Sequence, residues 1–177
     1  MKLATLSVLV LFAVVVFAAL GEPVQKQPAA KSGTAKAGAQ DETARVVAVL
    51  DDFHDAASKA DGKRYFAHFA AGGVFLGTDA KERWTVDEFR AYAKPYFDQG
   101  KGWTYAARAG RRFVTIAKDG QTAWFDEILD NAKYGECRGS GVLVKDEGAW
   151  KVAQYHLTVP VPNELMDEVA EKIRHRQ

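Results

Sequence analysis

The chain has 177 residues, of which 47% are hydrophobic and 11% aromatic, which is enough to bury the core of one compact domain. Its 24 basic and 23 acidic residues nearly balance and form no basic block, so nothing in the composition points to nucleic acid as a partner. The single cysteine, Cys137, excludes an intramolecular disulfide.

An apolar leader opens the chain. After Lys2, an uncharged run extends from Leu3 to Leu20. This run and the small-x-small pattern Ala19-Leu20-Gly21 predict a signal peptide over residues 1–21. An uncleaved membrane anchor is the alternative, because about 18 apolar residues are long enough to span a bilayer. In both cases we expect an exported domain, periplasmic or secreted, that contacts a membrane only if the leader is retained.

The two ends of the mature chain differ in character. Residues 22–41 are rich in Ala, Gly, Lys, Gln and Pro and contain one large apolar residue, Val24, so they predict a flexible linker. Residues 164–177 carry apolar side chains at helical spacing and predict a short C-terminal helix.

The first helix of the domain is predicted between Glu42 and Ala60, where apolar residues recur at the spacing of one helical face. These residues are Val46, Val49, Leu50, Phe53 and Ala57. His54 lies at the edge of this stripe beside several aspartates. It is either a pocket residue or metal ligand, or a boundary histidine on a solvated acidic face. The lack of a second histidine at ligand spacing favours the boundary position.

A short second helix is predicted over residues 63–69, followed by a brief strand and a polar connector. The third helix is predicted to begin at Thr85, which forms a capping box with Glu88. Trp84 and Phe89 stand at the two positions of a hydrophobic staple, so the start of this helix is the best-defined local feature of the chain.

From Gly102 onward strands replace the helical period. They are predicted at residues 103–108, 111–117 and 122–131, and in a hairpin over residues 138–163. The hairpin arms are rich in Val, Leu, Trp and Tyr and meet at a polar turn that contains glycine. Alternation along the second arm puts Trp150 and His156 on one face and Tyr155 and Leu157 on the other.

Three helices followed by a run of antiparallel strands predict an α+β domain. This order, together with several short motifs, resembles the nuclear transport factor 2-like superfamily and, within it, the SnoaL-like and ketosteroid-isomerase-like proteins. The motifs are Gly77-Thr78-Asp79, Glu82-Arg83-Trp84, Trp124-Phe125-Asp126-Glu127, Arg138-Gly139-Ser140-Gly141-Val142-Leu143 and residues 150–158. The resemblance covers residues 42–163.

The resemblance implies a cone-shaped fold, in which three N-terminal helices cover a curved antiparallel sheet and leave a pocket between them. It also implies a homodimer formed through the outer sheet face, which on the predicted alternation would cover Tyr155 and Leu157. The same fold serves isomerases, cyclases, dehydratases, binding proteins and oligomerisation modules, so it does not by itself select a function.

Three residues are candidate catalytic groups, Glu127, His156 and Asp79. If the His156 face looks into the cone, a carboxylate, a histidine and Arg138 converge there, and one residue could remove a proton that another returns. The strand parity is open at Glu127, and Asp126 is the alternative. Asp79 is either a second carboxylate at the cone mouth or a turn residue.

Five further residues are candidate ligand contacts, Arg138, Ser140, Trp84, Tyr96 and Trp124. The aromatic members of this set are explained equally well as core residues. No cofactor is expected, and no metal, because the histidines show no ligand spacing.

Two functions follow from these patterns. One is an exported domain that binds a small hydrophobic molecule in a cone-shaped pocket and performs cofactor-free acid-base chemistry of the isomerase or dehydratase type. The other is a non-catalytic dimerisation or interaction module. A buried Glu-Arg pair with a histidine beside it would also satisfy its polar groups without any catalysis, so the sequence leaves the choice open.

Overall fold

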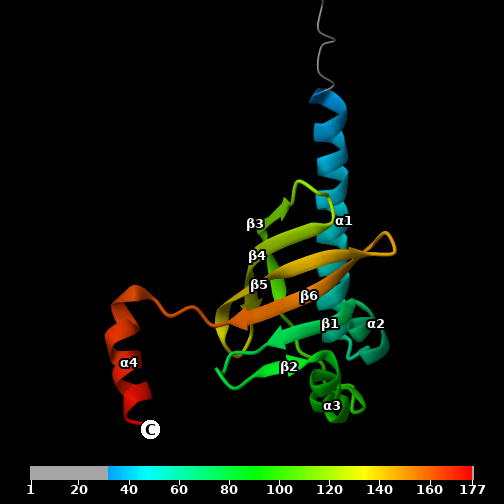
Figure 1. Cartoon of the computed structure of the whole chain (residues 1–177). Coiled ribbons are helices and arrows are strands. Elements are labelled where there is room, and N and C mark those ends of the chain that lie inside the picture. Colours follow the sequence, from blue (N-terminus) through cyan, green and yellow to red (C-terminus); the bar gives the residue numbers. More distant parts are fainter. Residues whose placement is uncertain (1–31, 177) are drawn as a thin grey trace, which may run out of the picture. The chain divides into compact units, whose positions relative to one another are not determined.

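The computed structural model describes residues 32–176, so the predicted signal peptide and the first part of the predicted linker lie outside the described residues. The helices are α1 (Ser32–Ser58), α2 (Gly62–Ala67), α3 (Val86–Phe97) and α4 (Met166–Arg174), with a 3-10 turn η1 (Asn163–Leu165). The strands are β1 (Phe69–Leu76), β2 (Arg83–Thr85), β3 (Ala106–Ile116), β4 (Thr122–Asn131), β5 (Gly135–Asp146) and β6 (Ala149–Thr158). Figure 1 shows their arrangement.

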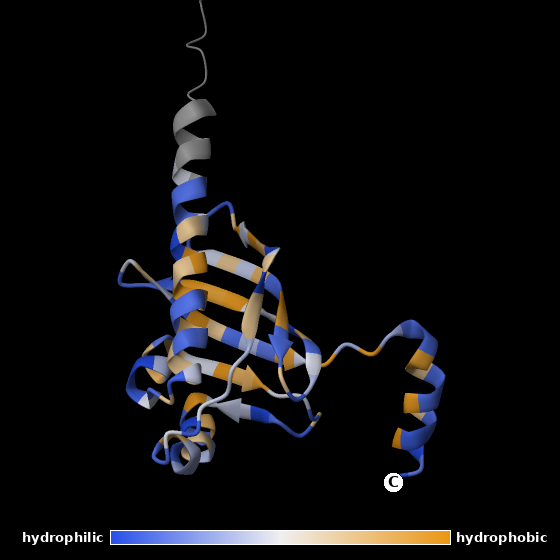
Figure 2. Cartoon of the chain, turned by 180° about the vertical axis from the view of Figure 1, so that it is seen from behind, coloured by the Kyte–Doolittle hydropathy of each residue, from blue (hydrophilic) through white to orange (hydrophobic). Residues whose placement is uncertain are grey.

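The strands form one curved, unclosed sheet in the order β2-β1-β6-β5-β4-β3. Neighbouring strands are antiparallel except β1 and β6, which are parallel. Helix α1 lies across one face of the sheet, and the hydrophobic colouring is concentrated in the strands behind it (Figure 2). The predicted α+β class, with helices packed on a curved sheet, is confirmed.

Helix α1 is longer than predicted. It begins at Ser32, so the backbone of residues 32–41 is helical and the prediction of a flexible linker is wrong for that part. Alanine, lysine and glutamine are good helix formers, and a helix already anchored by its apolar face extends at little cost. The anchoring face is the predicted one, because Val46, Leu50, Phe53 and Ala57 are all buried.

The start of α3 is as predicted. The Thr85 side chain accepts a hydrogen bond from the Glu88 amide, and the Glu88 carboxylate accepts one from the Thr85 amide at 2.8 Å. The Trp84 and Phe89 rings stack at 5.4 Å and 5°, which completes the hydrophobic staple. Together these contacts define the angle at which the chain passes from β2 into α3.

The predicted hairpin is formed by β5 and β6. Its turn residues, Glu147 and Gly148, both have positive φ, 48° and 81°, as a two-residue turn of type I′ requires. Further along, Val142 pairs with Gln154 and Leu143 pairs with Val152. One residue of β6, Ala153, is therefore left without a partner in β5 and forms a bulge.

The bulge reverses the alternation of β6. Trp150 is buried before it, and Tyr155 and Leu157 are buried after it. His156 lies on the outer face of the sheet, opposite Ser140 in the ladder. The prediction that Trp150 and His156 share a face is therefore wrong, as is the expectation that Tyr155 and Leu157 are available to a partner subunit.

The C-terminal residues form η1 and then α4, in agreement with the predicted short helix. Within residues 32–176, no helix is both long enough and apolar enough to cross a membrane.

Candidate active site

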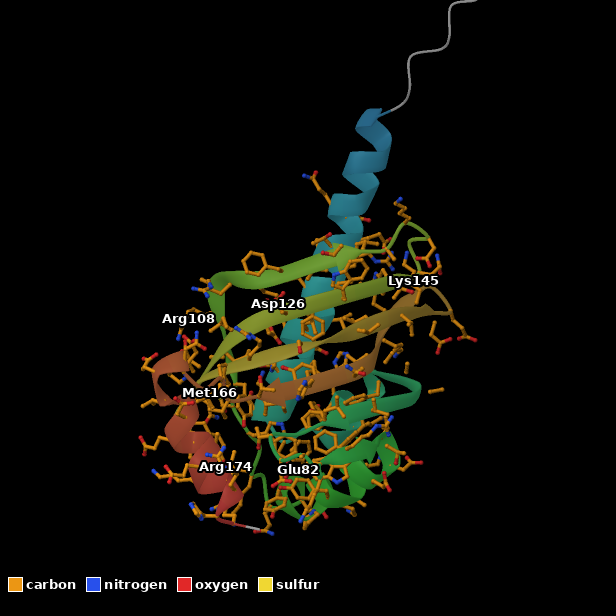
Figure 3. All side chains as sticks on the ribbon, turned by 60° about the vertical axis from the view of Figure 1, so that its left-hand side comes forward. Glu82, Arg108, Asp126, Lys145, Met166 and Arg174 are labelled. Atoms are coloured by element: carbon orange, nitrogen blue, oxygen red, sulfur yellow. The ribbon has the colours of Figure 1, made fainter. Side chains whose placement is uncertain are left out.

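A fully buried carboxylate lies midway along strand β4. Glu127 is 0% exposed and is the only charged residue in the described part of the chain that is buried. It shares the inner face of β4 with Phe125 and Leu129, which are also buried, whereas Asp126 is exposed on the outer face (Figure 3). The predicted set of Glu127, Phe125 and Leu129 is thereby found on one face, and the alternative residue Asp126 is on the other.

Three hydrogen-bond donors from three different elements converge on Glu127. His54 Nε2, from α1, lies 2.7 Å from Oε1, and the Tyr155 hydroxyl, from β6, lies 3.1 Å from the same oxygen. Arg112 Nε, from β3, donates to Oε2 at 2.7 Å. A carboxylate only accepts hydrogen bonds, so His54 carries its proton on Nε2.

The protonation states follow from these contacts. Burial raises the pKa of the Glu127 carboxyl, but the hydrogen bonds and charges of His54 and Arg112 lower it more, so its pKa lies below the ordinary value. Burial and the charge of Glu127 raise the pKa of the Tyr155 phenol well above its usual range. At neutral pH the centre therefore holds a carboxylate and a neutral phenol.

The space for this cluster is provided by a glycine. Gly139 lies opposite Glu127 in the β4–β5 ladder. A Cβ atom there would be 2.2 Å from the Tyr155 hydroxyl and 2.9 Å from Glu127 Oε1. Only glycine leaves room for the phenol to reach the carboxylate.

Arg112 connects the cluster to a polar pocket. Its guanidinium is 10% exposed and binds Asp51 Oδ1 through Nη1 at 2.6 Å, while Nη2 is buried without a hydrogen-bond partner among the described residues. Burial lowers the pKa of Arg112, but Glu127 and Asp51 raise it more, so the group stays charged. The pocket has a volume of about 290 Å³. Its lining comprises Asp51, His54, Asp55, Ser58, Thr104, Tyr105, Ala106, Ala107 and Arg112.

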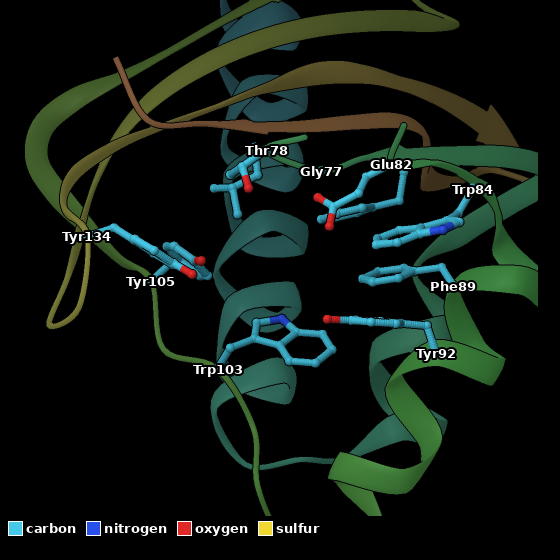
Figure 4. Close-up of a pocket in the computed structure, with 11 residues that line it drawn as sticks. Gly77, Thr78, Glu82, Trp84, Phe89, Tyr92, Trp103, Tyr105 and Tyr134 are labelled. Carbon is cyan, nitrogen blue, oxygen red and sulfur yellow. The ribbon is translucent and has the colours of Figure 1, made fainter. Parts of the chain in front are cut away.

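A second cavity, which we call the aromatic cavity, has a volume of about 270 Å³ (Figure 4). Its lining comprises Phe75, Gly77, Thr78, Glu82, Trp84, Phe89, Tyr92, Trp103, Tyr105, Tyr134 and Leu157. Burial is the main reason that the pKa of Tyr105 is raised to about 12, so its hydroxyl stays protonated.

A narrow space of about 20 Å³ lies between the two larger ones and shares residues with both. It shares Phe75, Trp103, Tyr105 and Leu157 with the aromatic cavity, and His54 and Tyr105 with the polar pocket. His54 thus stands where the interior of the domain meets the Glu127 cluster. No hydrogen bond to its Nδ1 is found within the described residues, which leaves this nitrogen for a ligand.

Several predicted site residues are elsewhere. Arg138 and Trp124 are exposed on the outer sheet face, where the half-buried His156 and Ser140 also lie. The Ala153 bulge inverts the expected parity of His156 and of the β5 residues assigned with it, and Trp124 faces outward because it alternates with the buried Phe125. These four residues do not approach the Glu127 cluster.

Asp79 and Tyr96 are also outside the cavities. Asp79 closes the turn before β2 by accepting from the Lys81 amide at 2.9 Å, and Tyr96 is exposed on α3. Of the predicted ligand contacts, only Trp84 lines the aromatic cavity.

The residues that sequence reasoning missed are His54, Arg112 and Tyr155. The sequence pattern favours a solvated surface for His54, because a single sequence does not reveal that a buried carboxylate will face the edge of the helix. Strict alternation excluded Tyr155. For Arg112 the sequence does contain a signal. Arg112 and the apolar Val114 are two residues apart in one strand, so their side chains lie on the same face of β3. Within residues 32–176, no three His, Cys, Asp or Glu side chains are grouped to hold a metal ion.

Comparison with known proteins agrees with this architecture. A cystatin-like-fold domain of unknown function from Nostoc punctiforme has 16% identity and a TM-score of 0.61, over 74% of this chain and 85% of that one. An NTF2-like family protein from Streptomyces avermitilis, described as a candidate dehydratase, has 11% identity and a TM-score of 0.57, over 70% and 99%.

A candidate scytalone dehydratase from Novosphingobium aromaticivorans has 12% identity and a TM-score of 0.56, over 69% of this chain and 86% of that one. Likeness at this level of identity establishes the fold alone. No curated protein matches the sequence. The family described as SnoaL-like domain matches residues 46–162, which is most of the described chain. The chain therefore belongs to the SnoaL-like domain family and has the NTF2-like fold.

Proposed function

We propose that the domain binds a small ring compound in the aromatic cavity and that His54 transfers a proton to or from it. The observation that carries this proposal is the position of His54. Its ring is hydrogen-bonded to buried Glu127 on one side and, on the other, lines the narrow space that adjoins the aromatic cavity. A histidine whose orientation is held by a buried carboxylate is an arrangement suited to general acid-base catalysis.

The position of the proton on the His54 ring supports Nδ1 as the base. His54 donates its Nε2 proton to Glu127, so neutral His54 has a lone pair on Nδ1. When Nδ1 takes a proton from the ligand, the Glu127 carboxylate stabilises the imidazolium that forms. The proton can then return to another atom of the same ligand, which is an isomerisation, or leave with a hydroxyl as water, which is a dehydration.

Tyr105 is suited to assist this transfer. It lines the aromatic cavity, the narrow space and the polar pocket, and its raised pKa keeps the hydroxyl protonated. A phenol beside the reacting atoms can donate a hydrogen bond to a ligand oxygen on which negative charge develops. Two of the similar structures are described as candidate dehydratases, which agrees with this reaction class by analogy of fold.

The test is a ligand and activity screen on the full-length chain with hydroxylated and carbonyl-bearing ring compounds. Binding is followed by calorimetry, and isomerisation or dehydration by chromatography of the product. His54→Gln should lower turnover by about a hundredfold or more, whereas His156→Gln should leave it nearly unchanged. Absence of binding across the screen, or turnover that survives His54→Gln, would contradict the proposal.

A second candidate function is a dimerisation module. Phe113 and Trp124 lie on the outer face of the sheet and are 59% and 49% exposed, which is unusual for large apolar side chains in neighbouring strands. A second copy of the chain that packs on this face would cover them, and the two functions are compatible. Export by the predicted leader remains part of the proposal.

A further inference from the structure

The aromatic cavity contains one charged side chain. Glu82 is the only acidic or basic side chain among its eleven lining residues, and it forms no ion pair with any residue in the described part of the chain. Its carboxylate accepts a hydrogen bond from the Asp79 amide at 3.1 Å and is directed toward the middle of the cavity (Figure 4). A half-buried carboxylate without a counter-charge favours a ligand that brings one.

The position of Glu82 is built into the β1–β2 connection. Gly77 and Glu82 are joined by a backbone hydrogen bond of 2.8 Å, and the Glu82 side chain folds back over Gly77. A Cβ atom at Gly77 would be 2.1 Å from Glu82 Oε2, so glycine is required for this placement. The loop therefore aims the carboxylate inward.

The other polar groups at the centre of the cavity are mainly oxygen atoms. The hydroxyls of Tyr92, Tyr105 and Tyr134 point toward the same space as Glu82 (Figure 4). Burial first, with a contribution from the charge of Glu82, raises the pKa of Tyr92 and Tyr105, so these groups stay neutral and able to accept as well as donate. An ammonium group, which only donates, complements one carboxylate surrounded by phenol oxygens.

The chain provides an example of this contact at the cavity edge. The Lys133 ammonium donates to the Tyr134 hydroxyl at 3.0 Å and lies 4.7 Å from the centroid of its ring. Lys133 is exposed and does not line the cavity. The hydroxyls of Tyr92 and Tyr105, which point into the cavity, can accept a hydrogen bond from an ammonium group in the same way.

We infer that the ligand of the aromatic cavity is a ring compound that carries a protonated amine, with Glu82 as the counter-charge and the tyrosine hydroxyls as additional acceptors. This inference rests on the proposed function, because it concerns the same cavity and the same ligand. It adds a prediction that the earlier proposal does not contain: positive charge on the ligand is favoured, and negative charge is rejected.

The experiment compares three probes of similar size on the full-length chain by calorimetry at pH 7. They are phenethylamine, which is cationic, 2-phenylethanol, which is neutral and also donates a hydrogen bond, and 3-phenylpropanoate, which is anionic. We expect the amine to bind about tenfold more tightly than the alcohol, and the acid most weakly. Glu82→Gln should remove the difference between the amine and the alcohol, since its amide oxygen still accepts from the Asp79 amide but carries no charge.

Two further variants test whether the position of the Glu82 carboxylate matters and whether the effect is specific to this charge. Gly77→Ala keeps Glu82 but displaces its carboxylate, so it should also weaken amine binding, with alcohol binding as the readout of an intact cavity. Asp87→Asn removes an exposed charge at the start of α3 and should leave the preference unchanged. Equal binding of amine and alcohol, or a preference that survives Glu82→Gln, overturns the inference but not the proposed function. If no probe binds, the inference is overturned, and the proposed function is decided by the wider screen of ring compounds.

Discussion

His54 on α1 and Glu127 on β4 are joined by a hydrogen bond of 2.7 Å, although 73 residues separate them in the chain. This bond ties helix α1 to strand β4 at Glu127, the only carboxylate that is buried in the described part of the chain. The stability of the domain and its proposed chemistry therefore depend on the same pair of side chains.

Replacing Glu127 by Gln should destabilise the domain strongly. The change leaves Arg112 buried beside a neutral amide, and the loss of one partner from a buried ion pair costs about 3–5 kcal/mol of unfolding free energy. Urea denaturation measures the effect. Asp126→Asn is the matched control, because this neighbouring carboxylate is exposed and its removal should change stability by less than about 0.5 kcal/mol. Equal stabilities of the two variants would contradict the assigned burial.

The same carboxylate should make stability depend on pH under acidic conditions. The pKa of Glu127 is lower in the folded protein than in the unfolded chain, so its contribution is complete above the ordinary carboxyl range, about pH 4.3, and is lost as the pH falls further toward the lowered value. In that window the wild type should lose unfolding free energy more steeply than Glu127→Gln. Parallel pH profiles for the two proteins would show that Glu127 titrates normally.

The two histidines provide a direct comparison of the inner and outer faces. His54→Gln should lower turnover of any identified substrate by about a hundredfold or more, because the proton acceptor is lost. His156→Gln should leave turnover within about twofold, because the residue lies on the outer face. Steady-state kinetics and a thermal melt of each variant separate loss of chemistry from loss of folding. A larger effect of His156→Gln than of His54→Gln would place the reaction on the outer face of the sheet and contradict the proposed role of His54.

Gly139 should not tolerate a methyl group. Gly139→Ala would press on the Tyr155 hydroxyl and Glu127, and overpacking of this kind costs about 1–3 kcal/mol. Gly38→Ala is the control, since Gly38 is in α1 with no atom within 4 Å of an added Cβ, and alanine there should stabilise by about 0.5–1 kcal/mol. Chemical denaturation of both variants checks the prediction, which fails if Gly139→Ala is neutral.

The outer sheet face tests the proposed homodimer. If a second copy covers Phe113 and Trp124, replacing both by Ser should convert a dimer to a monomer in size-exclusion chromatography with light scattering. The melting temperature of a monomeric wild type would instead change little with these surface substitutions. A dimer that survives both changes would mean that another surface forms the contact.

Local signals predicted the local structure well. The capping box at Thr85 and the turn at Glu147-Gly148 depend on residues within a few positions, and both were found where the sequence indicated. Strand β4 has the predicted limits, Thr122–Asn131. Alternation along β4 groups Glu127 with Phe125 and Leu129, and all three are buried on the inner face, because alternation along a regular strand is a local property.

The composition of the rest of the site depends on contacts that are distant in sequence. His54 and Arg112 acquire their roles only when α1 and β3 meet at Glu127, and no local pattern encodes that meeting. His156 was misplaced for a different reason, since one unpaired residue in β6 inverted a rule that holds on either side of it.

The unpaired residue Ala153 has a consequence for how this chain can change. Deleting it would leave Leu143 paired with Val152 and Val142 paired with Gln154, so β6 would alternate without interruption. Tyr155 and Leu157 would stay in the interior, and His156 would stay outside. The bulge is therefore a point at which this strand can lose a residue without exchanging the inner and outer side chains of the site.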